Sequence, residues 1–178
     1  MVREYPVRPI VLPRDLRGET PGFLPEHLLR PIKPYGRLHY LAADAYHALR
    51  AAGLSDGIRP FKPTSVGDTY RTVDMQRAGF LQRYQEQHIM GSSTRKWNGK
   101  VWYLKPGFAP MAAPGTSNHN LGIAVDIWSA SGERLEWLLA NALRFGWSWE
   151  LQSEPWHIRY VAGDNVPDAV KAWKQANG

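Results

Sequence analysis

The stretch Ser117-Asn118-His119-Asn120-Leu121-Gly122-Ile123-Ala124-Val125-Asp126 decides how this chain folds and what it holds. Over 121–128, apolar residues alternate with small or polar ones, a pattern that predicts a β-strand. His119 and Asp126 are seven positions apart, and an odd spacing would put them on opposite faces of one regular strand. We therefore expect His119 in a loop before the strand, with a bend at Gly122 that turns both side chains to the same side.

A second short motif, Glu154-Pro155-Trp156-His157, follows further along the chain. Pro155 has no N–H to give to a ladder, so we expect it at the entrance of a strand over 156–161. The side chains of His119, Asp126 and His157 match the three protein ligands of a catalytic zinc site, which keeps one position open for water. Glu154 is then a spare carboxylate that takes a proton from the attacking water and later gives it to the leaving amine.

The two motifs together are a better guide than any single histidine. A lone histidine is usually structural or exposed, and we interpret the four others in that way: His27, His39, His47 and His88. The joint pattern instead predicts one Zn²⁺ ion held by residues from both motifs.

Composition narrows the class of protein. Apolar residues make up 43% of the 178 residues, which suits one domain with its own core and argues against disorder. The net charge of +6 suits a polyanionic partner such as nucleic acid or an anionic cell wall. Lys and Arg are scattered, without a long basic run or a nucleic-acid-binding motif, which argues against nucleic acid. The absence of cysteine excludes disulfides and thiolate zinc ligands.

Prolines and apolar spacing predict the organisation of the chain. Seven prolines within residues 1–36 predict an extended N-terminal arm packed on a single domain formed by 37–178. We expect a strand over 68–71, and a small hairpin over 97–103 where Asn98-Gly99 suits a tight turn. Separate helices and short strands of this kind predict an α+β fold. The apolar spacing predicts four helices: 38–52 (ended by Gly53), 73–87, 132–145 (ended by Gly146) and 167–175.

Three segments of the chain resemble one known family. They are Tyr70-Arg71-Thr72 with Gln76, then 117–126, then 154–160, and the resemblance spans about residues 60–165. The family is the VanY-type zinc D-alanyl-D-alanine carboxypeptidases, whose relatives include phage endolysins that cut the L-alanyl-D-glutamate bond. Thr72 departs from the family, which often has serine there, and the proline-rich arm has no counterpart in it.

The resemblance implies a fold, a metal and residue roles. The fold would be a small antiparallel sheet flanked by helices, with zinc at its centre. By this match His119, Asp126 and His157 are the zinc ligands. Glu154 would be the catalytic base, and Arg71 would stabilise the transition state. Three further residues are expected to contact substrate: Ser117, Gln76 and Trp156.

The implied function is hydrolysis of a peptide bond in the stem peptide of bacterial peptidoglycan. The bond would be the terminal D-Ala-D-Ala bond or the L-Ala-D-Glu bond, and the residues leave both open. The expected partners are peptidoglycan peptides and the anionic wall, without nucleic acid or membrane, and the protein is expected to be a monomer. An alternative is a zinc-containing binding module of the same fold that does no chemistry. Glu154 argues against it, because a structural zinc site needs no base.

The N-terminus predicts where the protein acts. It shows no apolar signal-peptide segment, and no apolar run is long enough for a membrane helix. We therefore expect a phage endolysin or its catalytic domain, made in the host cytoplasm and acting on the wall after the membrane opens. The other possibility is an excised domain of an extracytoplasmic protein.

Overall fold

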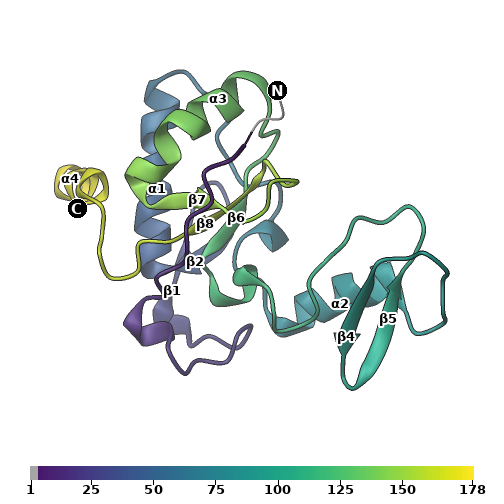
Figure 1. Ribbon diagram of the computed structural model, residues 1–178. Helices are drawn as coiled ribbons and strands as arrows, with labels where there is room; N and C mark the ends of the chain where they lie inside the picture. Colours follow the sequence, from purple (N-terminus) through teal and green to yellow (C-terminus); the bar gives the residue numbers. More distant parts are fainter. Residues whose placement is uncertain (1–3) are drawn as a thin grey trace.

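The structure is a computed structural model that describes residues 4–178, so the first three residues of the predicted arm lie outside it. The chain combines helices with groups of short antiparallel strands, which confirms the α+β class (Figure 1). None of the helices in the described part is long and apolar enough to cross a membrane.

The main sheet brings the two motifs together. It consists of β6 (Ala124–Asp126), β8 (His157–Tyr160) and β7 (Trp147–Trp149), antiparallel in the order β6-β8-β7. The register places Asp126 directly opposite His157. Residues opposite each other in an antiparallel pair lie on the same face about 5 Å apart, so this pairing alone joins the first motif to the second.

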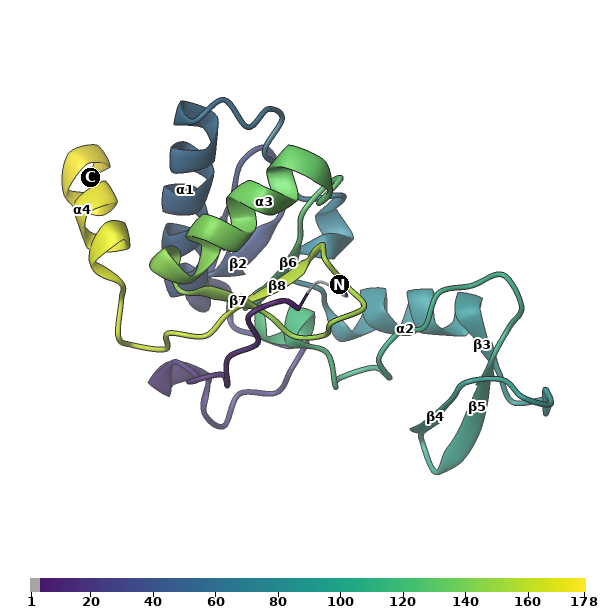
Figure 2. The same ribbon diagram turned by 45° about the horizontal axis from the view of Figure 1, so that its top comes forward.

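Three helices lie on one side of this sheet (Figures 1 and 2). They are α1 (Tyr40–Ser55), α3 (Gly132–Asn141) and α4 (Asp168–Asn177), and α1 packs against α4. Between helices and sheet lies an apolar core of large side chains, which places the sheet rigidly under the helices. Its largest fully buried members are Trp147, Trp149, Tyr46, Tyr160, Phe61, Leu38 and Leu49.

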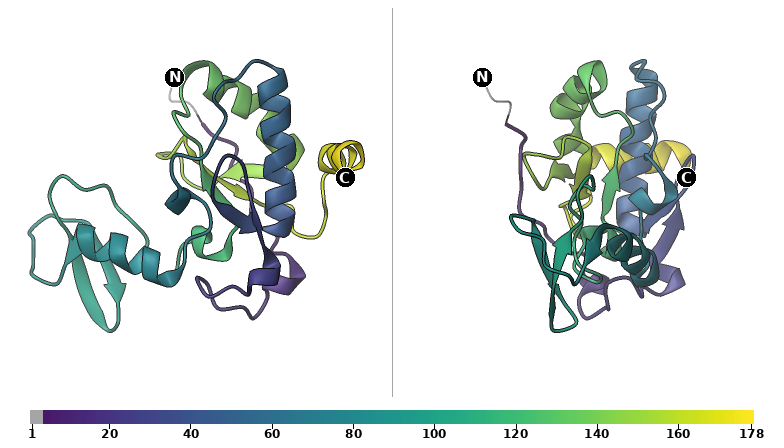
Figure 3. Two further views of the ribbon diagram at one scale, coloured as in Figure 1. Left: turned by 180° about the vertical axis from the view of Figure 1, so that it is seen from behind. Right: turned by 90° about the vertical axis from the view of Figure 1, so that its right-hand side faces the viewer.

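A second, smaller lobe projects to one side of the main body (Figure 3). It has its own apolar cluster, in which the rings of Phe80 and Tyr84 stack at 4.5 Å and Trp97 and Trp102 meet Phe80 edge-on. Asn98 and Gly99 both have positive φ, which confirms the predicted hairpin turn. The lobe comprises α2 (Val73–Arg83), β3 (Tyr84–Gln85), β4 (Thr94–Trp97) and β5 (Lys100–Leu104).

The N-terminal arm is tied to the main body along much of its length. Its leucines are buried in the main core, at Leu16, Leu24 and Leu28. Val7 forms a parallel bridge to Trp149 of β7, and the main chain of Tyr5 exchanges two hydrogen bonds with the side chain of Gln152. The arm ends in β1 (Leu29–Pro31), which pairs with β2 (Arg37–His39). The division into an arm and a separate domain stays a prediction.

Several predicted boundaries are wrong, each for a physical reason. Residues 68–71 form no strand, because Tyr70 and Arg71 give single backbone hydrogen bonds to Arg37 and His119 instead of joining a ladder. Helix α1 does not stop at Gly53 but runs to Ser55. A Cβ at Gly53 would lie 2.7 Å from the ring of Phe61, so this glycine serves packing rather than termination.

The other helices and strands deviate in length. Helix α2 ends at Arg83 because Tyr84 turns away to pair with Leu104 of β5. The helix predicted over 132–145 divides into α3 and a 3-10 segment that ends at Gly146, as expected. The strand predicted over 121–128 shortens to β6, since residues Asn118–Leu121 form the 3-10 helix η4.

The left-handed conformation of Gly122, between η4 and β6, leads to a prediction about stability. Gly122 has φ +66, and an added Cβ would lie 2.8 Å from the main-chain nitrogen of His39. Gly57 has φ +86 with nothing within 4 Å, so Gly57→Ala is a matched control for backbone strain alone. We expect Gly57→Ala to cost about 1 kcal/mol of unfolding free energy, and Gly122→Ala roughly 2–4 kcal/mol because overpacking is added. Urea unfolding measures both; equal costs would contradict the close approach.

Candidate metal centre

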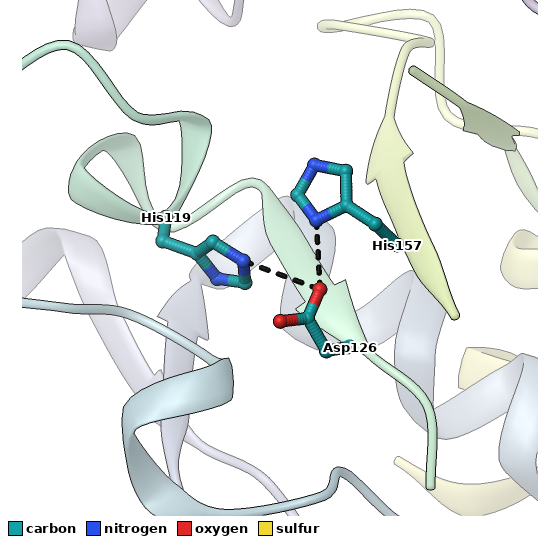
Figure 4. Close-up of side chains that lie close together, drawn as sticks. All are labelled: His119, Asp126 and His157. Carbon is teal, nitrogen blue, oxygen red and sulfur yellow. Dashed lines mark hydrogen bonds and ion pairs between the residues drawn. The ribbon is translucent and has the colours of Figure 1, made fainter. Parts of the chain in front are cut away.

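Three side chains from three elements converge at one point (Figure 4). His119 comes from η4, Asp126 from the end of β6 and His157 from the start of β8. The Oδ1 of Asp126 lies 3.3 Å from Nε2 of His119 and 2.7 Å from Nδ1 of His157. One ligand atom from each residue lies within 4.8 Å of the others, a spacing that suits a single ion.

The turn that carries His119 is built by its own sequence. Ser117 caps η4, since its Oγ accepts from the backbone N–H of His119 at 3.2 Å while the side chain of Asn120 accepts from the N–H of Ser117. At the other end Gly122 adopts the left-handed conformation, which confirms the predicted bend. The cap and the bend together direct His119 and Asp126 to the same side.

Second contacts fix the two imidazoles in orientations that suit a metal. Nδ1 of His119 bonds to the backbone oxygen of Thr69 at 2.9 Å, which leaves Nε2 facing Asp126. Nε2 of His157 bonds to the carboxylate of Glu150 at 2.7 Å, which leaves Nδ1 facing Asp126. Such partners on the outer nitrogens are the usual support of metal-ligating histidines. The residues present therefore fit a metal ion on chemical grounds.

In the absence of an ion, attraction between the histidines and the carboxylates of Asp126 and Glu150 holds these side chains together. Burial would raise the pKa of Asp126, but hydrogen bonds from His119 and His157 outweigh it and lower that pKa well below its usual range. Burial would lower the pKa of His157, but its bonds to Asp126 and Glu150 raise it to about 9. The bond from His157 lowers the pKa of Glu150 to about 2. In the metal-free protein a proton on His157 thus takes the place of the cation.

Glu154 lies apart from this hydrogen-bonded set. It is half-buried in the wall of the cleft that contains the three ligands, in a turn where its backbone oxygen accepts from the N–H of His157. Burial raises the pKa of its carboxyl; the charge of His157 lowers it, and the negative charges of Asp126 and Glu150 raise it again, so that the net shift is upward. A carboxylate with a raised pKa beside the ligands is a stronger base than an ordinary glutamate.

Arg71 is held rigidly at the edge of the site. Its Nε donates to the backbone oxygen of Gly67 at 2.7 Å and its Nη1 to Oε1 of Gln76 at 2.7 Å, with Asp68 at 3.7 Å. Gln76 is fully buried, and its amide also donates to the backbone oxygen of Ala112. The structure thus places Gln76 behind Arg71, where it orients the guanidinium.

The remaining residues line a cleft of about 1040 Å³ between the main body and the smaller lobe. Trp156 is 43% exposed in its wall, while Ser117 contributes to the wall as the cap of η4. The substrate contacts expected of Ser117, Gln76 and Trp156 stay predictions.

Two acidic residues of the site were not predicted from the sequence. Glu150 supports His157 and also accepts from the amide of Asn118 at 2.9 Å. Asp68 lies between Arg71 and Asp126, and its pKa is raised first by burial and also by Asp126. Neither belongs to a motif. The sequence offers one indication of a role for Glu150, which is its position just before the second motif. It follows β7 (Trp147–Trp149), a strand that the sequence did not predict.

Comparison with known proteins gives the site its context. An α+β fold gathers two histidines and an aspartate that could hold one divalent metal ion, beside a further carboxylate. The VanY family model, described as D-alanyl-D-alanine carboxypeptidase, matches residues 36–163, and the chain belongs to this family.

Individual relatives agree with this assignment. A D-alanyl-D-alanine carboxypeptidase of Enterococcus faecalis is 33% identical over 149 residues, which cover 74% of this chain and 48% of the relative. The chain therefore spans about half the length of that protein. Two solved structures share the fold: the LdcB LD-carboxypeptidase (TM-score 0.57, 22% identity, 88% of this chain and 77% of the other) and VanYB in complex with D-alanine-D-alanine (TM-score 0.53, 23% identity, 94% and 92%).

The contact between Glu150 and His157 predicts a loss of metal affinity. We expect Glu150→Ala to weaken zinc binding about 10- to 100-fold, because the outer nitrogen of His157 loses the partner that orients the ring. Competition with a chromophoric chelator measures the affinity. Ser153→Ala, an exposed position of the same loop, is the control. Equal affinity in both variants would show that Glu150 does not support the ligand.

The raised pKa of His157 predicts how the stability of metal-free protein depends on pH. With a pKa of about 9 in the folded state and 6.5 in the unfolded state, the stabilisation is complete below pH 6.5 and is lost as pH rises through 9. Denaturant midpoints of chelator-treated protein should therefore fall across this range. The midpoints of zinc-loaded protein should not show this fall, since the metal replaces the proton. A flat profile after chelation would contradict the assigned pKa.

Proposed function

We propose that the protein is a zinc-dependent D,D-carboxypeptidase that removes the terminal D-alanine from the stem peptide of bacterial peptidoglycan. The observation that carries the proposal is the convergence of His119, Asp126 and His157 beside the free carboxylate of Glu154. The family supports the substrate class, since its model and the matched relative are both described as D-alanyl-D-alanine carboxypeptidase.

The metal would be held by Nε2 of His119, a carboxylate oxygen of Asp126 and Nδ1 of His157. Two imidazoles and one carboxylate are a usual donor set for catalytic zinc. Zinc bound there would polarise the scissile carbonyl and lower the pKa of the attacking water.

Glu154 would move the proton. Its carboxylate takes a proton from the water as the water oxygen bonds to the carbonyl carbon. When the C–N bond breaks, Glu154 returns that proton to the amine nitrogen of the leaving D-alanine. Burial favours the protonated form of Glu154, which helps it to hold the proton between the two steps.

Arg71 and the cleft wall would hold the peptide. The guanidinium of Arg71, fixed by Gly67 and Gln76, would stabilise negative charge that develops on the carbonyl oxygen. We propose that the exposed ring of Trp156 and the hydroxyl of Ser117 contact the peptide, and that Gln76 contributes through Arg71.

The family descriptions favour the D-Ala-D-Ala bond over the alternatives. The assignments as L-alanyl-D-glutamate endopeptidase and as phage endolysin stay predictions, as does the place where the protein acts. A binding module without activity is disfavoured, because Glu154 stands in the cleft beside the ligands without being needed to hold the ion.

Product analysis tests the function and the base together. We expect zinc-loaded protein to release free D-alanine from a defined pentapeptide, and Glu154→Gln to retain zinc while losing two to four powers of ten in kcat. Mass spectrometry identifies the products, and metal analysis gives the zinc content. Separation of L-Ala from D-Glu would instead indicate an endopeptidase. Undiminished turnover by Glu154→Gln would remove Glu154 from the mechanism.

A further inference from the structure

The cleft has a division of charge that the proposed chemistry does not use. Around the ligands its wall is acidic, with Asp68, Glu150 and Glu154 beside Asp126. The part formed by the smaller lobe is basic, and its cations are Arg83, Arg95 and Lys96. A substrate that fills the whole cleft would therefore meet positive charge away from the scissile bond.

Two of these cations, Arg83 and Arg95, are partly buried without a carboxylate partner. Nη1 of Arg83 donates to the backbone oxygen of Ala109 at 3.2 Å. Arg95 donates from Nε to the backbone oxygen of Met111 at 3.1 Å and from Nη1 to that of Thr94 at 2.8 Å. Within residues 4–178 neither guanidinium forms an ion pair. A guanidinium has five N–H donors, so both side chains retain donors that an anion can use.

The two guanidiniums bond to the same short segment of the cleft wall. The carbonyls that hold them belong to Ala109 and Met111, two residues apart, whose Cα atoms are separated by at most about 7 Å. A carboxylate that reaches this segment would therefore meet two cations that bond to it.

Helix α2 relates Arg83 to Arg71. Gln76, which bonds to Arg71, lies in the first half of this helix, and Arg83 ends it seven residues later. Seven residues of α-helix rise about 10 Å. The backbones of Gln76 and Arg83 are thus separated along the helix by roughly the length of three residues of extended peptide.

The direction of the peptide follows from the proposed function, on which this inference rests. A carboxypeptidase releases one residue, so a long arm of the cleft serves the acyl side of the bond. In a stem pentapeptide, the residue two positions before the acyl D-alanine is D-glutamate, joined through its γ-carboxyl and carrying a free α-carboxylate. We propose that Arg83 and Arg95 form a subsite that binds this α-carboxylate and selects it over the amidated form, D-isoglutamine.

Two pentapeptides that differ only at this group test the subsite. We expect wild-type protein to hydrolyse the carboxylate form with at least about tenfold higher kcat/KM than the amide form, as loss of a charge-assisted bond implies. The ratio should fall several-fold in Arg83→Gln and in Arg95→Gln. It should be unchanged in Arg77→Gln, which removes the same charge from an exposed position of α2 outside the cleft.

The ratio separates the subsite from general damage, which would lower kcat/KM for both peptides alike. Equal hydrolysis of the two peptides by wild-type protein, or an unchanged ratio in both variants, would overturn the proposal. If Arg83→Gln fails to fold, Arg83→Lys keeps the charge and should keep most of the preference.

Release of D-alanine from neither peptide would contradict the proposed function instead. Calorimetry with zinc-loaded Glu154→Gln protein then compares the affinity for both peptides, and equal affinity would overturn the subsite.

Discussion

Everything in the site depends on one cross-strand pair, Asp126 of β6 opposite His157 of β8. The pairing is a matter of backbone register, yet it puts a carboxylate and an imidazole 2.7 Å apart. A slip of β6 by one residue would turn Asp126 to the opposite face of the sheet, away from His157. The apolar core beneath the sheet fixes that register, because the next pair along the two strands, Val125 and Ile158, is fully buried. Packing energy from the core thus sets the geometry of the polar centre.

The sequence was sufficient for the local features of the site and insufficient for its surroundings. The bend at Gly122 follows from an odd spacing and a residue that tolerates positive φ, and the hairpin follows from Asn98-Gly99. Strand β7 was missed since Trp-Ser-Trp is too short to show a period. Glu150 escaped because its contact with His157 depends on that strand. Segment 68–71 was predicted as a strand, although its backbone partners lie in distant elements that no local pattern reveals.

The cleft owes its length to the separation of two cores. The main core supports the ligands, while the aromatic cluster of the smaller lobe supports the opposite wall. Residues 109–113 span the gap and are held there by side chains of α2 and β4, through the carbonyls of Ala109, Met111 and Ala112. Because the two cores are separate, changes in the lobe can alter the shape of the cleft without disturbing His119, Asp126 and His157.

The arm that pairs with β7 has a consequence for the order of folding. Arg8 bonds to Ser148, and Val11 to Val161, contacts that close loops of some 140 to 150 residues. Loop closure of this kind is slow and must wait for the later partner to exist. During synthesis, residues 5–11 therefore leave the ribosome long before the strand they meet. The loop that carries Glu154, fastened by Tyr5 through Gln152, therefore cannot be completed before Gln152 has also been synthesised.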